Sequence, residues 1–239
     1  MPNDPFVDVA ALASLGPIRY LDARDQATFE GRHAPGAVRV PVDEWDKAAK
    51  AAGVGLDSTA YWDRALGSLG VDPSAVAVTY DGGQMTNAAR VWFILQYFGV
   101  KAVILNGGWP ALSAAVGLPA GGGPAEGPFH AVQGSGSVGS IDRETLKRQL
   151  DGAAHVFDTR TRAEFAGEDA RNRARSGHLP GAPPPVPCRS AGQWRRSSGA
   201  GAAKHAGARR FRPGRPHRHP LRRRRESGVG RSRSRARRI

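Results

Sequence analysis

The chain has 239 residues and a formal net charge of +14, but the charge is concentrated at one end. Residues 183–239 contain 17 Arg and one Lys against one acidic residue, a net charge of +17, which leaves −3 for residues 1–182. The first 182 residues have the composition of an ordinary globular protein, whereas the basic tail has too few large apolar residues to form a core and is predicted to be disordered. The single cysteine, Cys188, excludes an intramolecular disulfide and a Cys-rich metal site, and we expect no metal and no cofactor.

The N-terminal sequence is not typical of a secretory signal. Asp4 and Asp8 stand where such a signal has a basic start followed by an apolar stretch. The longest apolar run, residues 91–98, is far shorter than the roughly 20 residues that span a bilayer. We therefore expect a soluble, cytoplasmic protein.

Along the first half of the chain, short apolar runs alternate with helical stretches. Buried strands are predicted over residues 18–22, a short segment that ends in a polar residue, over residues 76–80, an apolar and β-rich run, and over residues 102–105. A short helix is predicted over residues 25–29, and a longer one over residues 87–98, where the apolar residues fall on one face. This alternation predicts the α/β class, with a parallel sheet flanked by helices on both faces.

A polar, glycine-containing turn, residues 81–86, follows the strand predicted over residues 76–80. Ligands of parallel sheets gather at the carboxyl ends of strands, and backbone N–H groups at the start of the next helix can converge there on an anion. A cysteine at position 81 would have its thiolate stabilised by this turn, but the chain has Asp81. The simplest interpretation is that Asp81 caps the turn and the following helix, so that this pocket position is non-catalytic.

One short cluster of residues occurs twice. Both copies combine Asp-x-Arg, a phenylalanine and His-x-Pro-Gly-Ala, at Asp22, Arg24, Phe29 and His33 and again at Asp158, Arg160, Phe165 and His178. The repetition predicts tandem domains. Because each histidine precedes a Pro-Gly turn, we expect both to fix that turn by hydrogen bonding rather than to act as acid–base groups. The aspartates and arginines of the two copies are expected to be structural as well.

The order of these motifs, with the sequences at residues 78–83 and 105–112, resembles the rhodanese family, and specifically the tandem-domain sulfurtransferases that act on thiosulfate or 3-mercaptopyruvate. The resemblance implies that a cysteine thiolate takes the sulfane sulfur from a small anionic donor and passes it from a persulfide to cyanide or a thiol. It also implies that the first domain carries Asp in place of the catalytic Cys, as Asp81 does here. We expect a rhodanese-like domain over residues 5–116 and the N-terminal part of a second one over residues 140–182.

Residues 117–139 join the two, and 11 of these 23 residues are Gly or Pro, which predicts a flexible connector. The second region begins with an amphipathic helix predicted over residues 142–150 and a strand over residues 155–158. Three arginines lie between Phe165 and His178, and the resemblance implies that arginines in this stretch bind the substrate anion. Arg175 is the candidate, and a solvated surface arginine is the alternative.

No residue of the second region can be assigned as the catalytic nucleophile. His33 precedes Asp81 by 48 residues, which places the equivalent of Asp81 near position 226, where Glu226 follows four arginines rather than an apolar strand. Cys188 has neither a strand before it nor a glycine-rich turn after it. We therefore expect the chain to be inactive as a sulfurtransferase in the form printed.

The composition after Ala182 is typical of a GC-rich gene read in the wrong frame. With codons chosen freely, residues 216–222 can be encoded so that a shift of one nucleotide reads Thr-Val-Thr-His-Cys-Gly, which resembles a strand and a catalytic cysteine. We therefore hypothesise a frameshift near codon 183, either a sequencing error or a pseudogene. Two alternatives take the tail as genuine: its arginine runs bind nucleic acid through phosphates, or the first domain alone acts as a non-catalytic binding module.

Overall fold

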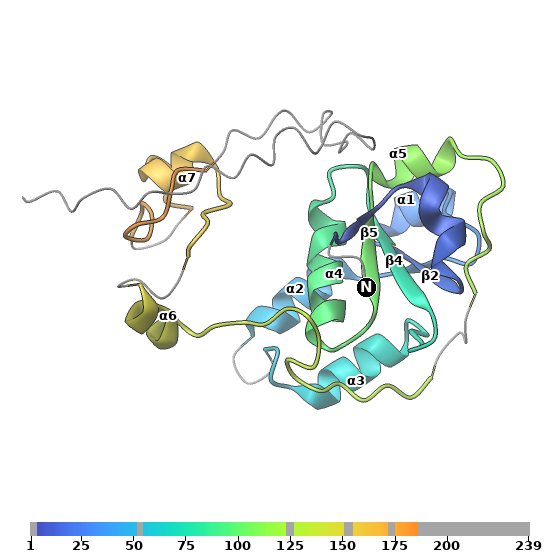
Figure 1. Ribbon diagram of the computed structural model, residues 1–239, viewed down its shortest axis with the longest axis horizontal. Helices are drawn as coiled ribbons and strands as arrows, with labels where there is room; N and C mark the ends of the chain where they lie inside the picture. The colour runs from blue at the N-terminus through green and yellow to red at the C-terminus, as the bar shows by residue number, and fades with distance from the viewer. Residues whose placement is uncertain (1–3, 52–54, 123–126, 151–154, 172–174, 186–239) are drawn as a thin grey trace, which may run out of the picture. The chain divides into compact units, whose positions relative to one another are not determined.

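The computed structural model of the protein describes residues 4–51, 55–122, 127–150, 155–171 and 175–185 (Figure 1). Five parallel strands form one sheet in the order β1-β5-β4-β2-β3. The strands are β1 (Phe6–Val7), β2 (Ile18–Asp22), β3 (Val38–Arg39), β4 (Val76–Tyr80) and β5 (Ala102–Leu105). The helices that belong with this sheet are the 3-10 helix η1 (Val9–Leu15), α1 (Gln26–Gly31), α2 (Val42–Lys50), α3 (Thr59–Gly67), α4 (Thr86–Tyr97) and α5 (Gly108–Ser113).

The three central strands lie where the sequence predicts them. β2 and β4 pair along their whole length, from Ile18 opposite Val76 to Asp22 opposite Tyr80. Every residue of β2 and β5 is buried, as expected of a strand that is covered on both faces. The predicted α/β class and the parallel sheet with flanking helices are confirmed.

Alternate residues of the strands supply two separate cores, one on each face of the sheet. One core joins Leu21 and Ala77 to side chains of α2, α3 and α4, including the buried Trp45 and Trp62. The other core, on the strand positions that alternate with these, packs against η1 and α5 through the side chains of Ile18, Tyr20, Val78, Leu12 and Leu112. Figure 1 shows α4 running along the sheet beside β5 and β4.

The Gly/Pro-rich segment between the two regions does not have the free course that its composition predicts. Two parts of it, residues 118–122 and 127–138, which together we call the strap, form hydrogen bonds with β2 and with the loops and helices around the sheet. The physical reason is that glycine, with no Cβ, lets the strap approach the neighbouring backbone closely.

The second region contains two short helices, α6 (Arg143–Gln149) and α7 (Arg162–Ala166). α6 confirms the helix predicted from residue 142, and the Asp142 side chain caps its first turn by accepting from the Thr145 N–H. The strand predicted over residues 155–158 is absent, because none of the described residues after β5 forms a strand with which it could pair. Phe157 is consequently 78% exposed. In the described part of the chain, no helix is long and apolar enough to cross a membrane.

Candidate functional site

The loop that joins β4 to α4 is organised around the carboxylate of Asp81. Its Oδ1 accepts hydrogen bonds from the backbone N–H groups of Gly83 and Met85, both at 2.9 Å. Its Oδ2 accepts from the N–H groups of Asn87 at 3.0 Å and Ala88 at 3.2 Å. Asp81 is 5% exposed, so one carboxylate satisfies four backbone donors at the N-terminus of a 12-residue helix. The capping position that the sequence predicts for Asp81 is therefore the one observed.

Two features fix the backbone of the loop: a left-handed residue just before α4 and a close contact from the start of α5. Met85 has a φ of 60°, a left-handed conformation that bends the chain just before α4 begins. Gly108 approaches the loop so closely that a Cβ there would lie 2.5 Å from the carbonyl oxygen of Asp81. Trp109 N–H donates to that same oxygen at 2.7 Å. The start of α5 thus holds the loop at the main chain of Asp81, while the Asp81 side chain holds the N–H groups of the residues that follow.

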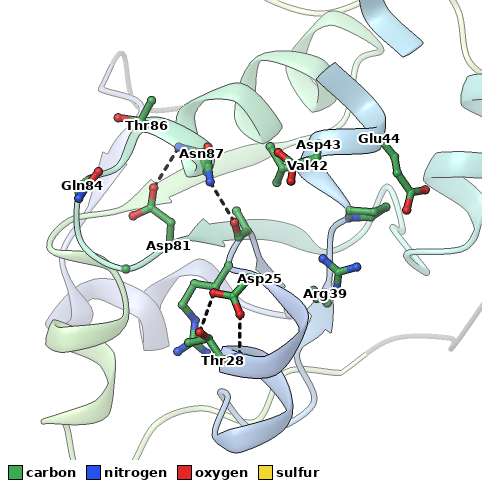
Figure 2. A pocket seen from close by; sticks show the side chains of 14 residues that line it. Asp25, Thr28, Arg39, Val42, Asp43, Glu44, Asp81, Gln84, Thr86 and Asn87 are labelled. Carbon is green, nitrogen blue, oxygen red and sulfur yellow. Dashed lines mark hydrogen bonds between the residues drawn. The ribbon is translucent and has the colours of Figure 1, made fainter. Parts of the chain in front are cut away.

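A polar cavity of about 550 Å³ opens in front of the loop, between the starts of α1, α2 and α4 (Figure 2). Asp25 lines it from α1, where its side chain caps the helix by accepting from the N–H and hydroxyl of Thr28. The charged residues of the lining are four carboxylates and two guanidinium groups, those of Asp25, Asp43, Glu44, Asp81, Arg24 and Arg39. The lining has neither a thiol nor an imidazole that could act as a nucleophile or a base. Within the described ranges, no group of three or more His, Cys, Asp or Glu side chains could hold a metal ion.

A buried ion pair lies next to this cavity. Arg24 binds Asp22 with Nε at 2.9 Å from Oδ1 and Nη2 at 2.5 Å from Oδ2, and its Nη2 also donates to the carbonyl of Arg32 at 2.7 Å. The guanidinium of Arg24 lies 4.4 Å from the centre of the Trp109 ring, a distance typical of a cation–π contact. Tyr80 packs beside it, and burial raises the pKa of Tyr80 well above that of a free tyrosine. Through the hydrogen bond to the Arg32 carbonyl, this ion pair links the end of β2 to the residue before His33.

Comparison with known proteins agrees with this geometry: residues 7–115 match the rhodanese-like domain family. Residues 7–115 are a rhodanese-like domain. The chain is 29% identical over 193 residues to 3-mercaptopyruvate sulfurtransferase of Escherichia coli, which covers 75% of this chain and 65% of that enzyme. It is 30% identical over 180 residues to thiosulfate sulfurtransferase of Gallus gallus, which covers 71% of this chain and 60% of that enzyme.

Solved structures give the same result. The crystal structure of SseA from Escherichia coli, a 3-mercaptopyruvate sulfotransferase, matches 75% of this chain and 74% of its own, with a TM-score of 0.53 and 26% identity. The Tum1 protein of Saccharomyces cerevisiae shares the fold, with a TM-score of 0.52 and 20% identity over 76% of this chain and 69% of its own. The protein therefore contains a rhodanese-like domain homologous to the 3-mercaptopyruvate and thiosulfate sulfurtransferases. It spans less than two thirds of the length of the two curated enzymes described above.

The second copy of the repeated cluster reproduces the hydrogen bonds of the copy in the rhodanese-like domain. Arg160 binds Asp158 with Nε at 2.9 Å from Oδ1 and Nη2 at 2.5 Å from Oδ2, and its Nη2 donates to the carbonyl of Gly177 at 2.8 Å. Hydrogen bonds from Arg160 are the largest of the effects that lower the pKa of Asp158, from its ordinary 3.8 to about 2. The Arg160 side chain is 31% exposed, against 6% for that of Arg24. The local motif is thus repeated, but its arginine is more exposed to solvent in the second region.

The two histidines have the same contacts in both copies. His33 Nδ1 lies 2.9 Å from the carbonyl oxygen of Phe29, and its ring stacks on the Phe29 ring with centroids 4.2 Å apart. His178 Nδ1 lies 3.0 Å from the carbonyl oxygen of Phe165, and the two rings stack at 3.9 Å. Each histidine thereby connects its Pro-Gly turn to the phenylalanine that precedes it in the motif. These contacts are those of a turn-fixing residue, and neither ring lines the cavity beside Asp81.

The other candidates from the sequence lie apart from this cavity or outside the described residues. Arg175, the candidate for binding a substrate anion, is exposed. The neighbouring Arg171 is half exposed and lies within ion-pair distance of Asp169 at 3.2 Å and Glu164 at 3.5 Å. Cys188 and the basic tail from residue 186 onward lie outside the described part of the chain.

Sequence reasoning found the loop but not the residues that hold it. The turn after β4 and the carboxylate of Asp81 were predictable, whereas the role of Gly108 and Trp109 in supporting the loop from α5 was not. The signal that could have found them is the sequence Gly107-Gly108-Trp109 directly after the β5 region. Two adjacent glycines at a strand end permit a close approach of backbone to backbone.

Proposed function

We propose that this protein derives from a tandem sulfurtransferase, of which the rhodanese-like domain over residues 7–115 is the non-catalytic half. The observation that carries the proposal is the state of its pocket loop, in which the carboxylate of Asp81 accepts four backbone hydrogen bonds. In a catalytic loop of this geometry, a cysteine sulfur would take the place of that carboxylate. The names of the homologous enzymes indicate thiosulfate or 3-mercaptopyruvate as the donor.

The proposed reaction requires a thiolate. The thiolate attacks the outer sulfur of the donor, so that a new S–S bond forms while sulfite leaves from thiosulfate, or the enolate of pyruvate leaves from 3-mercaptopyruvate. The outer sulfur of the resulting persulfide then passes to cyanide or a thiol, and the enzyme thiolate is the leaving group. Asp81 cannot carry out this chemistry, because a carboxylate oxygen forms no persulfide.

The charge of the cavity also favours a non-catalytic first half. Four carboxylates and two guanidinium groups line it, and Arg24 is already paired with Asp22. Such a lining repels a small sulfur-containing anion rather than binding it. We therefore propose that substrate binding belongs to the second region, where Arg175, whose side chain is exposed, is the candidate ligand. A guanidinium at that position would bind the carboxylate or thiosulfonate of the donor through paired hydrogen bonds.

We further propose that the printed chain is inactive and that its reading frame changes near codon 183. The recurrence of the Asp-Arg and His-Phe contacts in residues 158–178 supports a true second repeat up to that point. The test is to resequence the genomic DNA across codons 175–239. One inserted or deleted base near codon 183 that restores a Val-Thr-His-Cys-Gly-like loop supports the proposal, whereas an unchanged frame overturns the frameshift.

The enzymatic part of the proposal has its own test. The printed chain and a frame-restored chain are assayed for thiocyanate formation from thiosulfate or 3-mercaptopyruvate with cyanide, and for a cysteine persulfide by mass spectrometry. We expect turnover and a persulfide only in the frame-restored chain. Turnover by the printed chain would contradict its proposed inactivity. If the frame stands and no turnover is found, salt-dependent binding of the printed chain to RNA or DNA becomes the measurement to make.

A further inference from the structure

The first part of the strap lies against β2 and against the loop that leads into β3. The carbonyl of Pro119 accepts a hydrogen bond from Tyr20 Oη at 3.3 Å, and the N–H of Gly121 donates to the carbonyl of Pro35 at 3.1 Å. Leu118 packs against the core that contains Tyr20, on the face of the sheet covered by η1 and α5. The strap therefore starts on one of the two cores.

The second part of the strap packs against the other core. The N–H of Ala131 donates to Asp63 Oδ1 of α3 at 2.5 Å, and Ala131 itself is 7% exposed. Ser137 donates to Oε1 of Gln96 near the end of α4, and the amide nitrogen of Gln96 donates to the carbonyl of Ala102 in β5. Gln96 is 9% exposed, so its buried amide group is satisfied partly by the sheet and partly by the strap. Removal of the strap would leave one acceptor of this side chain without its partner.

Two glycines of the strap lie in positions that admit no larger residue. A Cβ at Gly121 would lie 2.8 Å from Tyr20 Cδ2 and 2.9 Å from the Pro35 oxygen. A Cβ at Gly136 would lie 1.5 Å from the carbonyl oxygen of Gln96, far inside van der Waals contact. The glycines that the composition assigns to flexibility are therefore used for close packing.

From these contacts we infer that the strap is an integral part of the rhodanese-like domain, which it completes up to Val138, and that it clamps both cores of the sheet. The inference does not depend on sulfur chemistry. Val138 packs against the core of α2, α3 and α4, and α6 begins at Arg143. The free connector between the two regions is thus residues 139–142 rather than the 23 residues that the composition indicates.

The clamp has a consequence for the second region. Five Cα–Cα steps from Val138 to Arg143 reach at most about 17 Å, whereas 23 free residues could extend to about 80 Å. The anchoring contact is made with Gln96, near the end of α4, and the Asp81 loop lies at the beginning of that helix. The strap therefore starts the second region near the end of α4 that is remote from the cavity, and it restricts where that region can lie.

The experiment compares glycine-to-alanine variants of the full chain in matched pairs. Gly136→Ala places a methyl group against the Gln96 carbonyl, whereas Gly139→Ala, three residues later, meets no atom within 4 Å. Gly121→Ala and its neighbour Gly122→Ala form a second pair of the same kind. Thermal unfolding is followed by tryptophan fluorescence. We expect Gly136→Ala and Gly121→Ala to lower the unfolding midpoint by more than about 5 °C, and both controls to stay within about 1 °C of the parent.

Hydrogen exchange on the unmodified chain tests the inference even if a variant fails to fold. The Ala131 amide, which donates to Asp63, should exchange at least about 100-fold more slowly than the amide of an unstructured peptide, and the amides of residues 139–142 should exchange at nearly the unstructured rate. Equal midpoints within each glycine pair, or exchange of Ala131 at the unstructured rate, would overturn the inference.

Discussion

Replacement of Asp81 by alanine tests how far the pocket loop depends on a single carboxylate. The change leaves four backbone N–H groups without their acceptor, and these groups differ in their access to water. The donors of Gly83 and Asn87 are partly exposed and can bond to water from the cavity, whereas those of Met85 and Ala88 are buried. A buried donor without a partner costs about 1–3 kcal/mol, so the two buried groups should together cost about 4 kcal/mol.

Asp81→Asn should cost about half as much. The amide oxygen replaces one carboxylate oxygen and still serves one pair of donors, while the NH₂ group faces the other pair and accepts nothing. Each carboxylate oxygen serves one buried and one partly exposed N–H, so either orientation of the amide leaves one buried donor without a partner. We expect a loss of about 2 kcal/mol.

Guanidinium unfolding followed by tryptophan fluorescence measures both losses, since four of the five tryptophans lie in the rhodanese-like domain, at positions 45, 62, 92 and 109. Asp25→Ala is the matched control. Asp25 also caps a helix through Thr28, but its carboxylate is exposed, so its removal should cost much less. We expect Asp81→Ala to lose the most stability, Asp81→Asn less, and the Asp25→Ala control the least. A free energy of unfolding for Asp81→Ala equal to that of Asp25→Ala would refute the account of the loop.

Three further predictions concern ionisation and reactivity. Asp81→Cys, in a chain whose other cysteine is replaced by serine, should react with iodoacetamide at pH 7 at least about 5-fold faster than glutathione, because the four N–H groups stabilise a thiolate; a rate equal to that of glutathione would contradict this. The carboxyl carbon of Asp158 should titrate near pH 2 by NMR and return towards its ordinary 3.8 in Arg160→Gln. Because the folded pKa is the lower one, the contribution of Asp158 to stability is fully present above about pH 4 and is lost as the pH falls towards 2; titration near pH 4 in the parent chain would refute the ion pair. Burial should keep Tyr80 neutral at pH 11, so its replacement by Phe should leave the 295 nm absorbance titration below that pH unchanged; a smaller absorbance rise in the variant would contradict this.

Periodicity and local composition were sufficient to predict the strands and helices whose residue patterns are pronounced. β4 and β5 are largely apolar runs, β2 is a short strand that ends in a polar residue, and α4 has its apolar residues on one face, so the sheet and its class follow from the sequence. β1 and β3 have two residues each, too few for any periodic signal, and their place in the sheet is set by pairing with β5 and β2. Pairing also decides the opposite case. The strand predicted at residues 155–158 is not formed, because no described strand lies beside it as a partner.

The sequence by itself determined the repeated motif, the parallel sheet and the position of Asp81 after β4, because these depend on residue type and short spacing. Only the tertiary structure decided that four N–H groups converge on that carboxylate, that Gly108 and Trp109 support the loop from α5, and that the strap clamps both cores. Those features depend on contacts between residues far apart in the chain. A glycine permits a flexible course and a close approach equally well, and only the neighbouring backbone decides between them.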